Sequence, residues 1–223
     1  IMTTITDQRP SDTAAPQSVT PQSGATTHWT GADGAGPWLA TARSLADTLA
    51  TRAAEHDRDN TFVHDGIELL REHRLMSMLV PAELGGGGAS HADAAAVLAE
   101  LAHGCPATSL TFSMHSHLVA AQVWRYHRDQ PAPVLEKVAA NQLVLVSTGA
   151  SDWIDSNGTA TRVEGGYRVS ARKTPASGAP AGNVVVTSVR WEDAPAGPQV
   201  IHCSIPFTAD GVSLEETWAT MGM

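Results

Sequence analysis

Residues 141–152 read Asn-Gln-Leu-Val-Leu-Val-Ser-Thr-Gly-Ala-Ser-Asp, and the hydrophobic pattern of the chain changes its period at this stretch. Before it, apolar residues recur every three or four positions, which is typical of amphipathic helices. From Leu143–Thr148 onward they form short β-branched or alternating runs, which are typical of strands. Helices first and strands second predict an α+β protein with segregated domains rather than alternating βαβ units.

The helical pattern upstream predicts an all-α domain over residues 37–140. Its second helix is expected over about Thr61–His73. Ser90, with the acidic Asp93 at the third helical position, predicts the capped start of a third helix. A fourth helix is expected from Pro106, because proline is tolerated in the first helical turn. A short fifth helix completes the predicted domain.

In the fourth predicted helix, one histidine falls among the apolar positions. The residues at helical spacing on that side are Leu110, Met114, His117, Leu118 and Ala121. We therefore expect His117 to be buried and hydrogen-bonded, or to face a substrate. His115 lies two positions away and points to a different face, so the pair lacks the four-residue spacing that suits a metal on a helix. The sequence predicts no metal site.

Residues 141–223 predict a small all-β domain. Gly165-Gly166 separates two strand-like runs and is a signal for a tight hairpin. Two β-branched runs, over residues 183–189 and 200–205, predict further strands. The alternation over Val212–Trp218 predicts one more strand near the end of the sequence.

Composition and charge exclude several classes of protein. The formal net charge of −9 argues against nucleic acid and against an anionic membrane as partners. No apolar run approaches the ~20 residues that span a bilayer, and no secretory signal is recognisable, so a cytoplasmic protein is expected. Residues 1–36, rich in Thr, Pro, Ser, Ala and Gly, predict a disordered tail. Cys105 and Cys203 are expected to be buried, reduced thiols.

Five local segments have a distinctive content, order and spacing. They include a loop with proline, an acidic residue and paired glycines, a helix opened by small residues, and a hairpin. The segments are Leu79–Gly86, Pro106–Ser109, Gly165–Lys173, Ala176–Ala179 and Trp218–Met223. Together, over residues 37–223, they resemble the acyl-CoA dehydrogenase family. The resemblance implies a helical N-terminal domain followed by a small β-barrel, here incomplete at its end, and a third four-helix domain for which this sequence has no residues.

The resemblance also implies where a flavin would bind. The first flavin segment of the family matches residues 146–152, shortened and without its Glu-Pro pair. It implies Ser147 and Thr148 as flavin contacts and Ser151 as a flavin or substrate contact. The second segment matches residues 173–177. Its implied contacts are Pro175, Ala176 and Ser177. Pro175 stands in place of an aromatic residue and lacks a backbone N–H. Without the resemblance, ordinary turn chemistry would explain these hydroxyl residues.

For activity, the resemblance implies FAD-dependent α,β-dehydrogenation of acyl-CoA or a similar thioester, with FMN as the alternative cofactor. The family's catalytic base lies in the third domain, so no catalytic residue is predicted here. Glu215 and Glu216 are expected to be solvated. The electron acceptor is left open, and a homo-oligomer is expected for the complete protein.

Two other functions stay open at this point. The first is a two-component flavin monooxygenase of the same fold, acting on aromatic or sulfur-containing compounds, which the absence of the Glu-Pro pair favours. The second is a non-catalytic module that binds a partner or a ligand.

Overall fold

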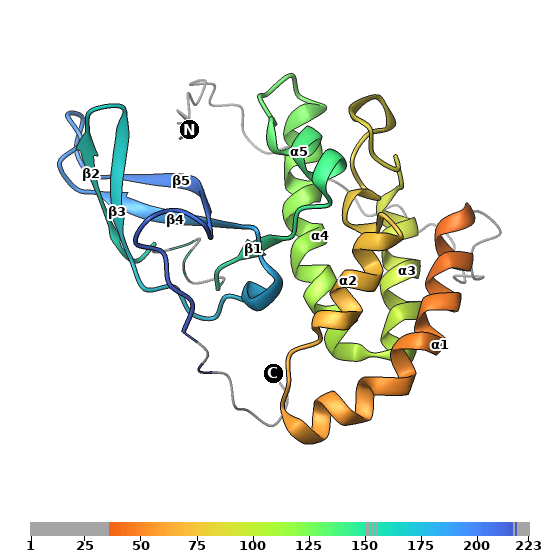
Figure 1. The fold of residues 1–223 in the computed structure, drawn as a ribbon. Coiled ribbons are helices and arrows are strands. Elements are labelled where there is room, and N and C mark those ends of the chain that lie inside the picture. Colours follow the sequence, from red (N-terminus) through yellow and green to blue (C-terminus); the bar gives the residue numbers. More distant parts are fainter. Residues whose placement is uncertain (1–35, 150–151, 153, 155, 216, 218–223) are drawn as a thin grey trace, which may run out of the picture.

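A computed structural model describes residues 36–149, 152, 154, 156–215 and 217. In these residues a helical region is followed by a sheet region of five strands (Figure 1). The segregated α+β fold class is therefore confirmed. The predicted tail over residues 1–36 lies almost entirely outside the described residues. Among the helices that the structure describes, none is long and apolar enough to cross a membrane.

The helical region contains five α-helices and two short 3₁₀ turns among the described residues. They are α1 (Gly36–Asp59), α2 (His64–Glu72), η1 (Leu75–Ser77), η2 (Ala82–Leu84), α3 (His91–Gly104), α4 (Pro106–Tyr126) and α5 (Val134–Asn141). Helix α1 packs along α3, and α3 packs along α4 (Figure 1). Gly104 permits the first contact, because a Cβ at this position would collide with the backbone carbonyl group of Ala46.

Local signals fixed the helix ends as predicted. Ser90 and Asp93 form a capping box, in which the Asp93 N–H donates to Ser90 Oγ over 3.1 Å and the Ser90 N–H donates to Asp93 Oδ2 over 2.8 Å. Pro106 occupies the first turn of α4. The second helix is shorter than predicted, because α2 begins only at His64.

The predicted burial of His117 is wrong, while its facing a substrate stays a prediction. His117 is exposed, and the buried histidine of α4 is His115. The buried stripe of the helix consists largely of hydroxyl-bearing and small polar residues: Thr108, Ser109, Thr111, Phe112, His115, Ser116, Leu118 and Val119. His115 bonds backbone groups of η1 and the first strand, against which α4 packs. Ser109 and Ser116 instead donate to the helix carbonyls of Leu98 and Phe112. The spacing of apolar residues alone could therefore not identify the buried face of α4.

The five strands form one sheet around a central strand. They are β1 (Leu145–Ser147), β2 (Thr159–Val163), β3 (Gly166–Ser170), β4 (Val184–Trp191) and β5 (Gln199–Pro206). Strand β4 pairs in parallel with β1 at its start, meets β2 at its end, and pairs antiparallel with β5 along its whole length. Strands β2 and β3 form the predicted hairpin, but its turn consists of Glu164 and Gly165 rather than Gly165 and Gly166, because Gly166 already pairs with Val163.

The described part of the sheet is open. No ladder in this part of the chain joins β1 or β3 to β5, so the described strands do not close into a barrel. Of the strand predicted over Val212–Trp218, residues 212–215 are not a strand, and Trp218 lies outside the described residues. Gly211, between β5 and this segment, has a φ of +82°, in the left-handed region that favours glycine. No described strand pairs with residues 212–215.

The start of the sheet shares the hydrophobic core of the helical region, whereas Ala160, Val189 and Cys203 form a second cluster within the sheet. Leu145 and Val146 of β1 belong to the same buried cluster as Phe112 of α4. A polar contact reinforces the junction, because Arg71 Nη2 donates to the Ala181 carbonyl and to Asn183 Oδ1, both over 2.9 Å. The start of the sheet is therefore held firmly against the helices.

Candidate functional site

The two segments that were predicted to contact a flavin meet at the end of β1. The first continues from Ser147 through Thr148 to Gly149, and the second runs from Lys173 toward Gly178. A Cβ at Gly149 would lie 3.0 Å from Pro175 Cδ, so the lack of a side chain at Gly149 allows the two loops to approach closely. Segments more than twenty residues apart in the sequence thus form one wall.

A buried ion pair ties the two loops together. Lys173 Nζ lies 2.6 Å from Asp152 Oδ1, and the side chains of Lys173 and Asp152 are only 11% and 5% exposed. Lys173 Nζ also donates to the carbonyl oxygens of Asn157 over 2.7 Å and Ser188 over 2.6 Å. All three hydrogens of the ammonium group therefore have acceptors.

The Asp152 carboxylate is equally well satisfied. Its Oδ2 accepts from Thr148 Oγ1 over 2.6 Å and from Thr187 Oγ1 over 2.9 Å, and its Oδ1 accepts from the Asn157 N–H over 3.1 Å. Burial raises the pKa of Asp152, but the hydrogen bonds from Lys173, Thr148, Asn157 and Thr187 outweigh it and hold the pKa at about 2. Both oxygens of this buried carboxylate are occupied by donors of the protein, so Asp152 fixes the geometry of the groups around it.

The predicted contact residues differ in what they still offer a ligand. Ser147 is buried, and among the described residues its Oγ has no hydrogen-bond partner. Thr148 is also buried, but its hydroxyl group already donates to Asp152. Pro175 is exposed, while Ala176 and Ser177 are half-buried. Ser151 lies outside the described residues. Contact of any of these residues with a flavin stays a prediction.

Helix α4 borders the same place. The methyl group of Thr111 lies 3.0 Å from the position that a Cβ of Gly178 would occupy, so the helix touches the second loop. One turn later, His115 accepts a hydrogen bond from the Leu145 N–H of β1. The site is therefore made by a helix and two loops that three separate parts of the sequence supply.

Sequence reasoning missed Asp152, Lys173 and His115. Asp152 and Lys173 both stand inside the two flavin segments, yet no periodic pattern connects them, because their pairing depends on how β1 and β4 lie side by side. The only available signal was the rarity of a lysine or aspartate next to strand-like apolar runs. Glu215 is exposed, as predicted, and pairs with Arg172 over 2.7 Å.

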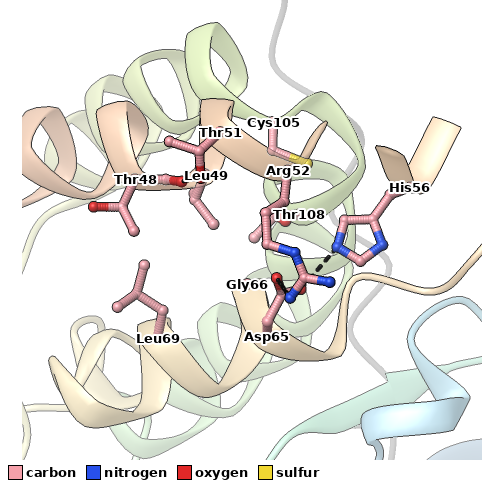
Figure 2. A pocket seen from close by; sticks show the side chains of 10 residues that line it. All are labelled: Thr48, Leu49, Thr51, Arg52, His56, Asp65, Gly66, Leu69, Cys105 and Thr108. Atoms are coloured by element: carbon pink, nitrogen blue, oxygen red, sulfur yellow. Dashed lines mark hydrogen bonds and ion pairs between the residues drawn. The ribbon is translucent and has the colours of Figure 1, made fainter. Parts of the chain in front are cut away.

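A separate pocket of about 230 Å³ lies between α1 and α2, and Figure 2 shows the residues that line it. Its polar rim is a network in which Arg52 Nη1 lies 2.7 Å and His56 Nε2 lies 2.9 Å from the two oxygens of Asp65. Its floor includes Thr108 and Cys105. No predicted flavin residue lines this pocket, so it is distinct from the site at the end of β1.

No other feature of the described residues suggests a metal or a disulfide. Within this part of the chain, no group of three or more His, Cys, Asp and Glu side chains could hold a metal ion. Cys105 and Cys203 are both free and buried, which confirms the prediction made from their spacing.

Comparison with known proteins gives the context for this site. Residues 38–142 match the family described as acyl-CoA dehydrogenase, N-terminal domain. The chain is 31% identical over 187 residues to the Pseudomonas putida protein named probable FMNH2-dependent monooxygenase SfnC, covering 83% of this chain and 46% of that protein. It is 30% identical over 190 residues to dibenzothiophene monooxygenase of Rhodococcus erythropolis, with the same coverage of 83% and 46%.

Comparison with solved structures also finds a similar protein. The structure of KijD3 in complex with FMN and a dTDP-sugar matches with a TM-score of 0.72 and 26% identity, covering 81% of this chain and 46% of that chain. The chain therefore spans about half the length of the proteins that it matches. The matched half contains both the helical region and the loops at the end of β1.

Proposed function

Because this chain belongs to the acyl-CoA dehydrogenase superfamily, we propose that it is the flavin-binding portion of an FMN-dependent monooxygenase that receives reduced flavin from a separate reductase. This proposal replaces FAD-dependent dehydrogenation of acyl-CoA as the leading function. The support is that relatives 30% and 31% identical over 83% of the chain are named as monooxygenases, one of them FMNH2-dependent.

One structural observation carries the proposal. Ser147 Oγ is buried beside the converging loops and has no partner among the described residues. A buried hydroxyl group without a hydrogen bond costs about 1–3 kcal/mol. Thr108 and Ser156 also have such hydroxyl groups, but of these three residues only Ser147 lies in a segment predicted to contact a flavin. The polar edge of a flavin ring offers both donors and acceptors. Ser147 therefore fits a cofactor edge better than it fits the folded chain alone.

The surrounding residues suit such a group. The ion pair of Asp152 and Lys173 fixes the loops without offering a proton, so the wall stays rigid while a ligand binds. Pro175 presents an exposed apolar ring without an N–H, and Ser177 beside it retains a hydroxyl and a backbone N–H. When bound, reduced FMN would supply the electrons that activate oxygen. The chain's own residues would hold and orient the ring and shield it from water.

The substrate proposed is a small aromatic or sulfur-containing molecule, because the relatives named above include a dibenzothiophene monooxygenase. KijD3 binds a dTDP-sugar, so the superfamily fold also accommodates a different class of small molecule. Two free, buried thiols fit a reducing compartment such as the cytoplasm. The expected homo-oligomer stays a prediction, which sedimentation of the whole protein tests.

The test uses the whole protein with three separate assays. Fluorescence titration compares FMN with FAD, and we expect saturable binding with a clear preference for FMN. Oxygen consumption is then followed with NADH and a separate flavin reductase, with dibenzothiophene as the probe substrate. Anaerobic bleaching of bound FAD by acyl-CoA would instead establish the dehydrogenase. Absence of saturable binding of either flavin would favour the non-catalytic module.

A single substitution tests the role of Ser147. We expect Ser147→Ala to weaken FMN binding about tenfold, the loss of roughly one hydrogen bond. Stability of the flavin-free protein should stay within about 0.5 kcal/mol, because the hydroxyl has no partner to lose. Ser116→Ala is the matched control, since Ser116 is buried in α4 and bonds its own helix at the Phe112 carbonyl over 2.8 Å. FMN affinity unchanged in Ser147→Ala would contradict the proposed contact.

A further inference from the structure

His115 joins three separate parts of the fold through both nitrogens of its ring. Its Nε2 lies 2.8 Å from the carbonyl oxygen of Met76 in η1. Its Nδ1 accepts a hydrogen bond from the Leu145 N–H, the first residue of β1, over 3.0 Å. The ring is only 1% exposed and stacks on Phe112 with 6.2 Å between ring centroids. No other side chain of the described residues joins α4, η1 and β1 in this way.

The two bonds leave His115 one tautomer and no charge. A backbone N–H can only donate, so Nδ1 carries no proton, while a carbonyl can only accept, so Nε2 carries one. The charged and titratable groups that influence the ring are Arg71 of α2 and His117 of α4, neither of which is an anion. Burial lowers the pKa of His115 to about 4, the Met76 carbonyl opposing this effect, so the ring is neutral at physiological pH. Because both nitrogens are bound to backbone groups and the ring is buried, we assign His115 a geometric role.

The bond to Leu145 lies on the free edge of β1. Strand β1 is the end strand of the sheet path, and it pairs only with β4 among the described strands. The backbone carbonyl of Val144 points toward β4, because it accepts a hydrogen bond from the Val184 N–H over 3.3 Å. The next residue, Leu145, directs its N–H to the other edge, where Nδ1 of His115 supplies the acceptor that a neighbouring strand would otherwise provide.

We propose that His115 is a positioning residue of the flavin site: by accepting from Leu145 it holds the free edge of β1 and so sets where Ser147, two residues further on, meets the cofactor. The inference rests on the proposed function, because only a bound flavin gives the position of Ser147 a consequence. Under this proposal the two ring nitrogens of His115 have different roles. The Nδ1 bond determines flavin affinity, whereas the Nε2 bond only secures the helix against η1.

Two substitutions separate the two bonds. In His115→Asn the side-chain amide occupies about the place of Nδ1, so an acceptor for Leu145 remains while the bond to Met76 is lost. In His115→Gln the amide reaches about the place of Nε2, so a donor to Met76 remains while the Leu145 N–H loses its acceptor. Both variants lose the imidazole ring and one hydrogen bond, so we expect comparable losses of stability. If His115 had only a structural role, the FMN affinity would change equally in the two variants.

The experiment measures FMN affinity and amide hydrogen exchange in the whole protein. We expect His115→Gln to weaken FMN binding about tenfold and His115→Asn about threefold or less, because only the first frees the edge of β1. Exchange of the Leu145 amide should accelerate in the Gln variant and much less in the Asn variant. His117→Gln, two residues away and exposed, should match the wild type in both measurements.

The outcomes separate this inference from the proposed function. Equal FMN affinities for the Asn and Gln variants, or a greater loss in the Asn variant, would overturn the positioning role while wild-type FMN binding still supports the function. If the wild type binds no FMN, the proposed function fails. In that case only the hydrogen-exchange measurement tests whether His115 holds β1. Faster exchange over β1 in the Gln variant only would then support the hold on β1, and equal exchange in both variants would overturn it.

Discussion

Asp152 and Asp65 are the centres of two polar networks that use similar residues in opposite environments. Asp152 is 5% exposed and its partner Lys173 is 11% exposed, whereas Asp65 is 38% exposed and Arg52 is 50% exposed. In both, burial raises the carboxyl pKa and hydrogen bonds or nearby cations lower it more, so the net shift is downward. The networks differ in their surroundings: protein groups surround the charges at Asp152, whereas water reaches the charges at Asp65.

This difference shows why one network can define a site and the other cannot. Around Asp152 the protein itself supplies every partner, so a displacement of Asp152 or Lys173 would leave a buried charge unpaired. Around Asp65 water can replace any lost partner, so the geometry is weakly constrained. A pocket of about 230 Å³ borders the exposed network of Asp65 (Figure 2). The pair of Asp152 and Lys173, however, is the buried and fully hydrogen-bonded network, and such fixed supports are what a cofactor site needs.

The largest effect is expected from removing one partner of the buried pair. Lys173→Met leaves the Asp152 carboxylate buried without its cation, which costs about 3–5 kcal/mol of unfolding free energy. Chemical denaturation measures this loss, and FMN affinity should fall with it because the two loops separate. The neighbouring Arg172→Met is the matched control. Its pair with Glu215 is on the surface, with side chains 77% and 59% exposed, so about 0–1 kcal/mol is expected. Similar losses in both variants would refute the contrast.

An effect of intermediate size on the free energy of unfolding is expected when the pH is lowered. The pKa of Asp152 is about 2 in the folded protein against an ordinary value of 3.8. The depressed value means that its stabilisation is complete above the unfolded pKa and disappears as pH falls from about 4 toward about 2. Its size is about 2 kcal/mol, at about 1.4 kcal/mol for each pKa unit.

Asp152→Asn checks the sign of this effect. The variant should be less stable than the wild type at pH 7, because Lys173 then lacks its counter-charge. It should also lose less stability than the wild type between about pH 4 and pH 2. Parallel stability curves for the two proteins over this interval would show that Asp152 is not the titrating group.

The smallest effect is expected in the exposed network. Asp65→Asn removes the carboxylate that Arg52 and His56 contact, yet both side chains can turn to water, so a loss of about 1 kcal/mol or less is expected. Because the pKa of Asp65 is lowered, this small contribution is present above its unfolded pKa and fades as pH falls. Added salt should reduce it further, whereas the Lys173 effect should barely change. A salt-insensitive loss of several kcal/mol would make the two networks equivalent.

Local features were predicted correctly wherever neighbouring residues decide them. Ser90 and Asp93 cap α3, and Gly165 turns the β2–β3 hairpin, because each depends on residues only a few positions apart. The strand predicted over Val212–Trp218 shows the limit of this reasoning. Its alternating pattern suits a strand, but a strand exists only where a neighbour supplies hydrogen bonds, and residues 212–215 have none.

The candidate site divides in the same way. The family resemblance selected the two loops, and the structure brings them together at the end of β1. It could not indicate that Thr148 already bonds Asp152 while Ser147 remains unpaired. Likewise, helical spacing favoured His117 over His115, because the spacing describes which residues share a face and not which face is covered.

By itself, the sequence determined the order of helices before strands and the cap of α3, because period, capping and turn chemistry act over a few residues. Only the tertiary structure decided which charges are buried, which hydroxyl groups lack a partner and which histidine contacts β1. Those properties depend on groups that lie tens of residues apart, such as Asp152 with Lys173 and His115 with Leu145. Burial and hydrogen-bond satisfaction are set by such distant neighbours once the chain is folded.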